Sequence, residues 1–198
     1  EFIIVGPPDD PANITGLTSS SEIFRRIHEN RDSITFVSRG DNSGTHVKEL
    51  QIWNSANITI KGDDPEWASK NNWYVQTGSG MGATLTVTSE LKAYTLTDIG
   101  TWLFMKDDLQ LVKLASGPVE WHNPYGAILV NPDKFSPGTI KFELAKKYVR
   151  WLISLKGQSL INSYLISGEQ AFHADFANHI NEMTQKELDF WDISNEYN

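Results

Sequence analysis

The sequence predicts an α/β fold, because strand-like segments alternate along the chain with segments of helical apolar spacing. Residues 34–38, Ile-Thr-Phe-Val-Ser, are mostly β-branched or apolar. Val47, Leu50 and Trp53 then recur at the spacing of one helix face. The turn between these two segments is rich in Gly, Asp and Asn. The predicted order is therefore strand, tight polar turn, helix.

The residues before and after this unit predict one strand, one helix and a long loop. Phe2 to Val5 is a short apolar run that ends at a Gly-Pro-Pro turn. Ser19 to Glu22 spells a capping box, which begins a helix that reaches about Asn30. Residues 55–73 are polar and contain turn residues, so we expect mostly loop, with a short helix before Trp67.

The middle of the chain contains one ambiguous element. In residues 81–91 the threonines and the valine favour a strand, whereas the glycine-rich entry favours the start of a helix. Residues 93–96 read as a strand, and Thr97 is expected to cap a helix through Met105. Two further strands are expected, over residues 109–114 and 127–130.

The C-terminal part begins with the clearest helix, from about Thr139 to Leu155, with Gly157 expected as the residue that follows its end. A second helix is expected through residues 160–165. Residues 171–198 form an acidic C-terminal tail. Two alternatives remain open there: a solvated tail, or a docked helix over residues 184–191.

Composition limits the classes of partner. A chain of 198 residues, 39% hydrophobic and 21% charged, can bury one or two cores. Its formal net charge of −8 argues against a nucleic-acid partner, because phosphate neutralisation needs a clustered basic face. The absence of cysteine excludes disulfides and thiolate metal sites. No apolar run is long enough for membrane insertion or for a signal peptide.

The most informative stretch is residues 38–46, Ser-Arg-Gly-Asp-Asn-Ser-Gly-Thr-His. A helix that begins here presents free backbone N–H groups and a partial positive charge of about half a unit. Ser43 and Thr45 add hydroxyl donors, while Arg39 adds a permanent cation with forked donors. These residues, together with Ser38 and the Gly44 amide, predict an oxyanion site.

Simpler interpretations of the same residues remain open. Ser43 or Thr45 can be only the N-cap of the helix, with Arg39 a solvated surface charge. Ser43 could also be a hydrolase nucleophile, but this requires a base within about 3 Å of its hydroxyl, and no partner can be assigned. Asp41 is expected to hydrogen-bond turn amides or to orient Arg39 from behind. His46 is expected to be a surface histidine, with a supporting role beside the bound anion as the alternative because it lies in the first turn of the helix. The five histidines show no metal-like spacing.

Several motifs resemble, in order, those of the tungstate-binding proteins of bacterial and archaeal ABC importers. The matching segments are residues 2–11, 38–46 with Glu49, 73–74, 78–85, 93–98 with 100–101, and 125–132. The resemblance implies a type II periplasmic-binding-protein fold, in which two α/β lobes close around one oxyanion. It also favours a helix rather than a strand over residues 81–91.

The resemblance implies a domain organisation and a function. Residues 15–122 would form a complete lobe, and residues 1–14 with 123–170 would form part of a second lobe. The protein would be a non-catalytic solute-binding protein for tungstate or molybdate, periplasmic or extracellular, with an ABC transporter membrane subunit as partner and no cofactor. The second glycine-rich turn could contact the ligand through the backbone at Met81 and Gly82, or through Thr84.

Two departures from the family pattern qualify these expectations. Nothing in the chain corresponds to the family segment that precedes Phe2, so we expect an exposed apolar sheet edge or helix face in the second lobe. Ile99 stands where the family usually has arginine, which removes one cation. An alternative function is therefore a binding-protein remnant that acts as a non-catalytic interaction module.

Overall fold

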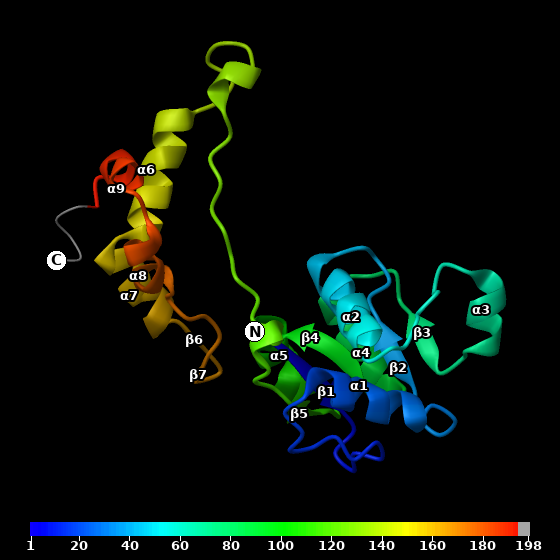
Figure 1. Cartoon of the computed structure of the whole chain (residues 1–198). Helices are drawn as coiled ribbons and strands as arrows, with labels where there is room; N and C mark the ends of the chain where they lie inside the picture. Colours follow the sequence, from blue (N-terminus) through cyan, green and yellow to red (C-terminus); the bar gives the residue numbers. More distant parts are fainter. Residues whose placement is uncertain (194–198) are drawn as a thin grey trace. The chain divides into compact units, whose positions relative to one another are not determined.

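The computed structural model describes residues 1–193, which divide into two compact units, one of residues 1–124 and one that begins at Tyr125 (Figure 1). Among the described residues, none of the helices combines the length and the apolar character that crossing a bilayer requires.

The described residues of unit 1 form five strands. They are β1 (Phe2–Gly6), β2 (Phe36–Ser38), β3 (Tyr74–Gln76), β4 (Thr95–Asp98) and β5 (Val112–Ala115). β1 lies between β4 and β5 and is antiparallel to both, while β2 and β3 are parallel to each other. A parallel bridge between Phe36 and Tyr94 joins these two groups of strands. Val37 donates to the Tyr94 carbonyl at 2.8 Å, and Tyr94 donates to the Thr35 carbonyl at 2.9 Å.

The helices of unit 1 confirm most of the predicted elements. They are α1 (Ser20–Glu29), α2 (Gly44–Ser55), α3 (Pro65–Lys70), α4 (Met81–Glu90) and α5 (Ile99–Met105), with short 3-10 turns η1 (Lys106–Asp108) and η2 (Val119–Trp121). α1 and α2 pack their apolar faces on the strands through an aromatic cluster. Its rings belong to Phe24, Phe36, Trp53, Trp73 and Tyr74. Rings in edge or offset contact such as these stabilise a core beyond the area they bury.

Two details of unit 1 differ from the sequence-based expectations. Residues 1–14, expected in a second lobe, lie in unit 1 because β1 is the middle strand of its sheet. Thr97 does not cap the following helix, because it pairs with Ile3 inside the sheet. The cap is Asp98, whose carboxylate accepts from the Thr101 amide at 2.8 Å.

Unit 2 is mainly helical. It contains η3 (Pro132–Lys134), α6 (Phe142–Ile153), α7 (Leu155–Ser163), the two-residue strands β6 (Leu165–Ile166) and β7 (Glu169–Gln170), α8 (Phe176–His179), η4 (Ile180–Glu182) and α9 (Gln185–Trp191). The acidic tail docks on α6 through an Arg150–Asp192 ion pair of 2.6 Å and through Lys146, 3.8 Å from the centre of the Phe190 ring. Of the two alternatives left open by the sequence, the docked helix is the one observed, as α9; residues 194–198 lie outside the described residues.

Unit 2 also departs from the prediction in two places. The strand expected over residues 127–130 does not form: no described strand pairs with this segment, and Ile128 is 91% exposed. Gly157 does not follow the end of a helix but lies in the first turn of α7, which Ser154 caps. A side chain at this glycine would overlap the Trp151 carbonyl, so the close approach of α6 and α7 requires glycine.

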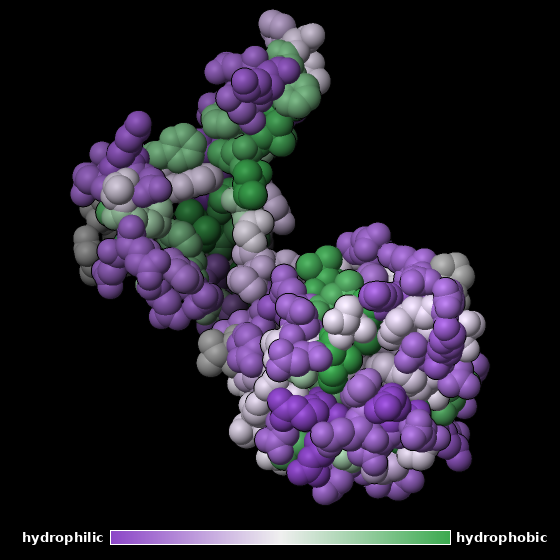
Figure 2. Space-filling model, turned by 45° about the vertical axis from the view of Figure 1, so that its right-hand side comes forward, coloured by the Kyte–Doolittle hydropathy of each residue, from purple (hydrophilic) through white to green (hydrophobic). Residues whose placement is uncertain are grey.

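The expected exposed apolar surface is present on unit 2. Leu144, Tyr148 and Trp151 lie on one face of α6 and are 68%, 60% and 43% exposed. Figure 2 shows apolar side chains gathered on the surface of this unit. Contiguous apolar surface of this kind marks contact sites or aggregation-prone faces in soluble proteins.

Candidate oxyanion site

Three helices of unit 1 begin where three neighbouring strands end. β2 leads into α2, β3 leads into α4, and β4 leads into α5. β2 is parallel to β3 and to the chain that enters β4, so all three helix starts lie at the same edge of the sheet (Figure 1). In open α/β sheets ligands bind outside the carboxyl ends of the strands, and the candidate turn occupies this position.

Arg39 is held by Asp41 at this edge. Its Nη2 donates to the Asp41 Oδ2 at 2.6 Å, and the two side chains are 19% and 21% exposed. The Ser43 amide donates to the other carboxylate oxygen at 3.1 Å. Partial burial would raise the pKa of Asp41, but hydrogen bonds from Ser43 and Arg39 outweigh it and hold the pKa below its usual value. The expectation that Asp41 orients Arg39 and binds a turn amide is confirmed.

Arg39 also has a donor that no described residue uses. Its Nε–H is buried and has no hydrogen-bond partner among the described residues. A buried donor without a partner costs free energy comparable to a lost hydrogen bond, so such a group requires an explanation. An anion bound at this turn would supply the missing acceptor.

α2 begins as a helix N-terminus capped by a serine, a kind of helix start at which anions commonly bind. Ser43 is the N-cap, and its hydroxyl accepts from the His46 amide at 3.4 Å. The amides of Gly44 and Thr45 belong to the first turn of the helix, where N–H groups have no carbonyl partner within the helix. The tight turn before it has Gly40 and Asn42 at φ of 60° and 57°, a left-handed conformation that these two residue types accept.

Ser38 faces away from this edge and into the protein. Its hydroxyl donates to the Glu49 carboxylate at 2.6 Å and accepts from the Gly40 amide at 3.2 Å. Ser38 is fully buried. Its hydroxyl hydrogen is therefore used to anchor the turn, and the structure does not present it as a donor for a ligand.

Thr77, which no sequence motif marks, holds the second glycine-rich turn beside the first. The Thr77 amide donates to the Ser38 carbonyl at 3.0 Å, and the Thr77 hydroxyl lies 2.9 Å from that of Thr84. Thr84 is fully buried and also bonds the Gly80 carbonyl. The sequence offers one sign that Thr77 joins the two turns, which is its position directly after the strand β3.

Met81 and Gly82 begin α4 behind this turn. Met81 is buried, and the space beside Gly82 is occupied by the Met105 sulfur, 3.2 Å from where a Cβ would stand. The structure therefore brings the start of α4 close to the Arg39 turn, while the side chains of Met81 and Thr84 point into the core. Only backbone groups at the start of α4 remain available to a ligand.

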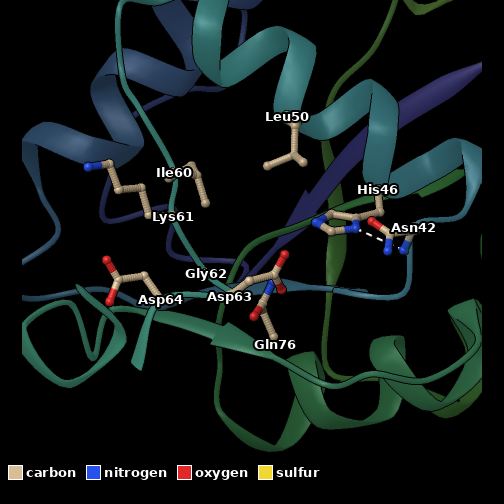
Figure 3. Close-up of a pocket in the computed structure, with 9 residues that line it drawn as sticks. All are labelled: Asn42, His46, Leu50, Ile60, Lys61, Gly62, Asp63, Asp64 and Gln76. Carbon is tan, nitrogen blue, oxygen red and sulfur yellow. Dashed lines mark hydrogen bonds between the residues drawn. The ribbon is translucent and has the colours of Figure 1, made fainter. Parts of the chain in front are cut away.

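His46 is buried, so the expectation of a surface histidine is wrong. It is 3% exposed, and its Nδ1 accepts from the Asn42 amide at 3.0 Å. Its Nε2 has no partner among the described residues and points into a cavity of about 390 Å³ (Figure 3). The cavity is lined by Asn42, His46, Leu50, Ile60, Lys61, Gly62, Asp63, Asp64 and Gln76. Within residues 1–193, no group of three or more His, Cys, Asp or Glu side chains could hold a metal ion.

Comparison with known proteins identifies the superfamily of this chain. Residues 1–156 match the PBP superfamily domain, and the chain belongs to this superfamily. The tungstate-binding protein TupA of Peptoclostridium acidaminophilum is 40% identical over 166 residues, 83% of this chain and 54% of that protein. TupA of Campylobacter jejuni is 30% identical over 181 residues, 88% of this chain and 62% of that protein. The resemblance to tungstate-binding proteins is confirmed.

Solved structures with titles that name tungstate proteins also resemble this chain. The tungstate-binding protein TupA from Desulfovibrio alaskensis G20 matches with a TM-score of 0.70 and 36% identity, over 87% of this chain and 66% of that one. The tungstate ABC transporter structure from Geobacter sulfurreducens matches with a TM-score of 0.69 and 41% identity, over 83% and 64%. A putative ABC transporter anion-binding protein of Haloferax volcanii is 40% identical over 190 residues, 93% of this chain and 51% of that protein. The chain thus spans only about half the length of this relative and of the Peptoclostridium acidaminophilum protein.

Proposed function

We propose that this chain binds tungstate or molybdate at the Arg39 turn, without catalysis. The observation that carries the proposal is the position of the Arg39 guanidinium beside the first turn of α2, at the carboxyl edge of parallel strands. Arg39 would supply charge and a planar fork, and the amides of Gly44 and Thr45 would supply directed donors. The hydroxyls of Ser43 and Thr45 would complete a tetrahedral set of contacts.

The ligand must compete with a resident carboxylate. Asp41 accepts hydrogen bonds from the Arg39 guanidinium and from the Ser43 amide. A tetrahedral dianion carries more charge and more acceptor atoms than a carboxylate, so it can engage the free Nε–H as well as shared donors. The names of two relatives, which specify tungstate, support this choice of anion class.

We further propose that the protein acts outside the cytoplasm as the solute-binding partner of an ABC transporter membrane subunit. Support comes from membership of the PBP superfamily and from similarity to a protein described as a tungstate ABC transporter. No cofactor is needed for such a role, because binding and release of the anion involve no covalent step.

A second candidate function is a non-catalytic interaction module, which the exposed apolar face of α6 favours. A hydrolase based on Ser43 gains no support from the described contacts. The Ser43 hydroxyl accepts from the His46 backbone, while the His46 ring bonds the Asn42 amide. Among the described residues, the nucleophile and base pair that acyl transfer requires is not formed at Ser43.

Isothermal titration calorimetry of the chain with sodium tungstate, molybdate and sulfate tests the proposal. We expect one site, with tungstate and molybdate bound at least about tenfold more tightly than sulfate, which corresponds to roughly 1.4 kcal/mol. Arg39→Gln is the control, with its fold checked by circular dichroism. Absence of binding heat with all three anions would overturn the proposal and favour the interaction module.

A further inference from the structure

A buried carboxylate lies directly beneath the Arg39 turn. Glu49 is 2% exposed and accepts hydrogen bonds from the Ser38 hydroxyl at 2.6 Å, the Tyr74 hydroxyl at 2.6 Å and the Trp53 indole at 3.1 Å. These donors come from β2, β3 and α2. In the described part of the chain, no lysine or arginine forms an ion pair with it. A buried charge without a cation is costly, and hydrogen bonds offset only part of that cost.

The hydrogen bonds connect this carboxylate to the backbone of the turn. Ser38 precedes Arg39, and the Ser38 hydroxyl that donates to Glu49 also accepts from the Gly40 amide. Glu49 thus fixes the residues on both sides of Arg39. If Glu49 takes up a proton, its carboxylic O–H can donate to the Ser38 oxygen, which has a second lone pair. The contact is then kept with its direction reversed, and one negative charge leaves the site.

We propose that Glu49 is a positioning residue that links oxyanion binding at the Arg39 turn to the uptake of one proton. The inference rests on the proposed function, and it specifies how that function depends on pH. An oxyanion and an ionised Glu49 repel each other through the poorly screened interior, so the anion binds more tightly to the protonated form. By thermodynamic linkage, the bound anion increases the proton affinity of Glu49 by the same factor.

Glu49 gains or loses its proton near neutral pH, so the coupling between proton uptake and anion binding acts in that pH range. Burial raises the pKa of Glu49 to about 7, although the hydrogen bonds from Ser38, Tyr74 and Trp53 act in the opposite direction. Burial and the neighbouring Glu49 raise the pKa of the Tyr74 hydroxyl, so it stays protonated. Other charged or titratable groups on the surrounding elements include His46 and Lys48 of α2, the Arg39–Asp41 pair after β2, Asp98 at the end of β4 and, on α1, Glu22, Arg25, Arg26, His28 and Glu29. Asp63, in the loop before α3, also helps to raise the pKa of Tyr74.

Calorimetric titration with molybdate and tungstate between about pH 5.5 and 8.5 tests the inference. For the parent chain we expect the dissociation constant to rise above about pH 7, by up to about tenfold per pH unit. Glu49→Gln keeps a hydrogen-bonding side chain without the titration. It should bind with a pH-independent affinity close to that of the parent at low pH, which a purely structural role would not produce.

Two further variants separate Glu49 from its neighbours. Tyr74→Phe keeps the ring but removes a donor that favours the ionised carboxylate, so the midpoint of the pH profile should move upward. This variant also keeps the inference testable if Glu49→Gln does not fold. His46→Asn retains an acceptor for the Asn42 amide and removes the imidazole; its binding should still depend on pH.

The outcomes are distinguishable. A parent chain that binds tungstate or molybdate with a flat pH profile overturns the role of Glu49 and leaves the proposed function intact. The same holds if Glu49→Gln retains the pH profile of the parent, or if His46→Asn abolishes it. A parent chain that binds neither anion at any pH overturns both the proposed function and the inference.

Discussion

The Arg39 guanidinium donates to the Asp41 carboxylate across 2.6 Å, and the same carboxylate accepts from the Ser43 amide. This arrangement orients Arg39 toward the first turn of α2 before any ligand arrives. It also leaves the Arg39 Nε–H buried without a partner among the residues described. The turn is therefore fixed in place but has one unused donor, which is what the proposed anion site requires.

Replacement of Arg39 should weaken tungstate binding strongly. Charge-assisted hydrogen bonds contribute on the order of 1.5–3 kcal/mol each, so Arg39→Gln should raise the dissociation constant by roughly ten- to a hundredfold. Arg39→Lys keeps the charge but not the planar fork, and a loss close to that of glutamine would show that geometry dominates. Calorimetry measures both, and unchanged affinity in both variants would refute the assignment.

Replacement of Ser43 should lower both stability and anion affinity, whereas replacement of Thr45 should act on anion affinity. Ser43→Ala removes the N-cap of α2 and should lower the free energy of unfolding by about 1 kcal/mol, in addition to weakening binding. Thr45→Val conserves shape and removes one neutral donor, so it should weaken binding less than Arg39→Gln does. Urea denaturation and anion titration of both variants would check this. A Ser43→Ala protein as stable as the parent would contradict the capping role.

Glu49 should make stability depend on pH. Its pKa is about 7 in the folded protein against an ordinary 4.5, so the unfolded chain releases this proton first as the pH rises. The stabilisation is therefore fully present below about pH 4.5 and is lost as the pH rises through 7, roughly 3 kcal/mol in all. Glu49→Gln lacks this loss. Urea denaturation at pH 4.5 and 8 should show that the free energy of unfolding falls less with pH in the variant than in the parent. An equal fall in both proteins would exclude the effect.

Gly157→Ala should destabilise unit 2, although alanine normally favours a helix over glycine. A Cβ at Gly157 would overlap the Trp151 carbonyl and stand 2.7 Å from the Leu152 carbonyl. Overpacking of this kind typically costs about 1–3 kcal/mol. Gly126→Ala is the matched control, because nothing lies within 4 Å of its added Cβ. Thermal unfolding followed by circular dichroism compares the two, and equal melting temperatures would argue against the close α6–α7 contact.

Local signals were sufficient for most helices and strands. The capping sequence at Ser19, the apolar run that begins at Phe2 and the turn chemistry around Gly40 each act within a few residues, so they are readable without the fold. The strand expected over residues 127–130 does not form, because strand formation depends on contacts that are not local. A strand needs a partner, and sequence alone does not show whether one is in reach.

The sequence by itself determined the order of elements and the chemistry of the turn, because Arg39, Ser43 and Thr45 carry their charge and donors wherever the chain places them. Only the tertiary structure decided which groups face a ligand. It turned the Ser38 hydroxyl inward to Glu49, buried His46 and joined the two glycine-rich turns through Thr77. These outcomes depend on contacts between residues distant in sequence, and on which side of the sheet each chain segment crosses, so no local pattern records them.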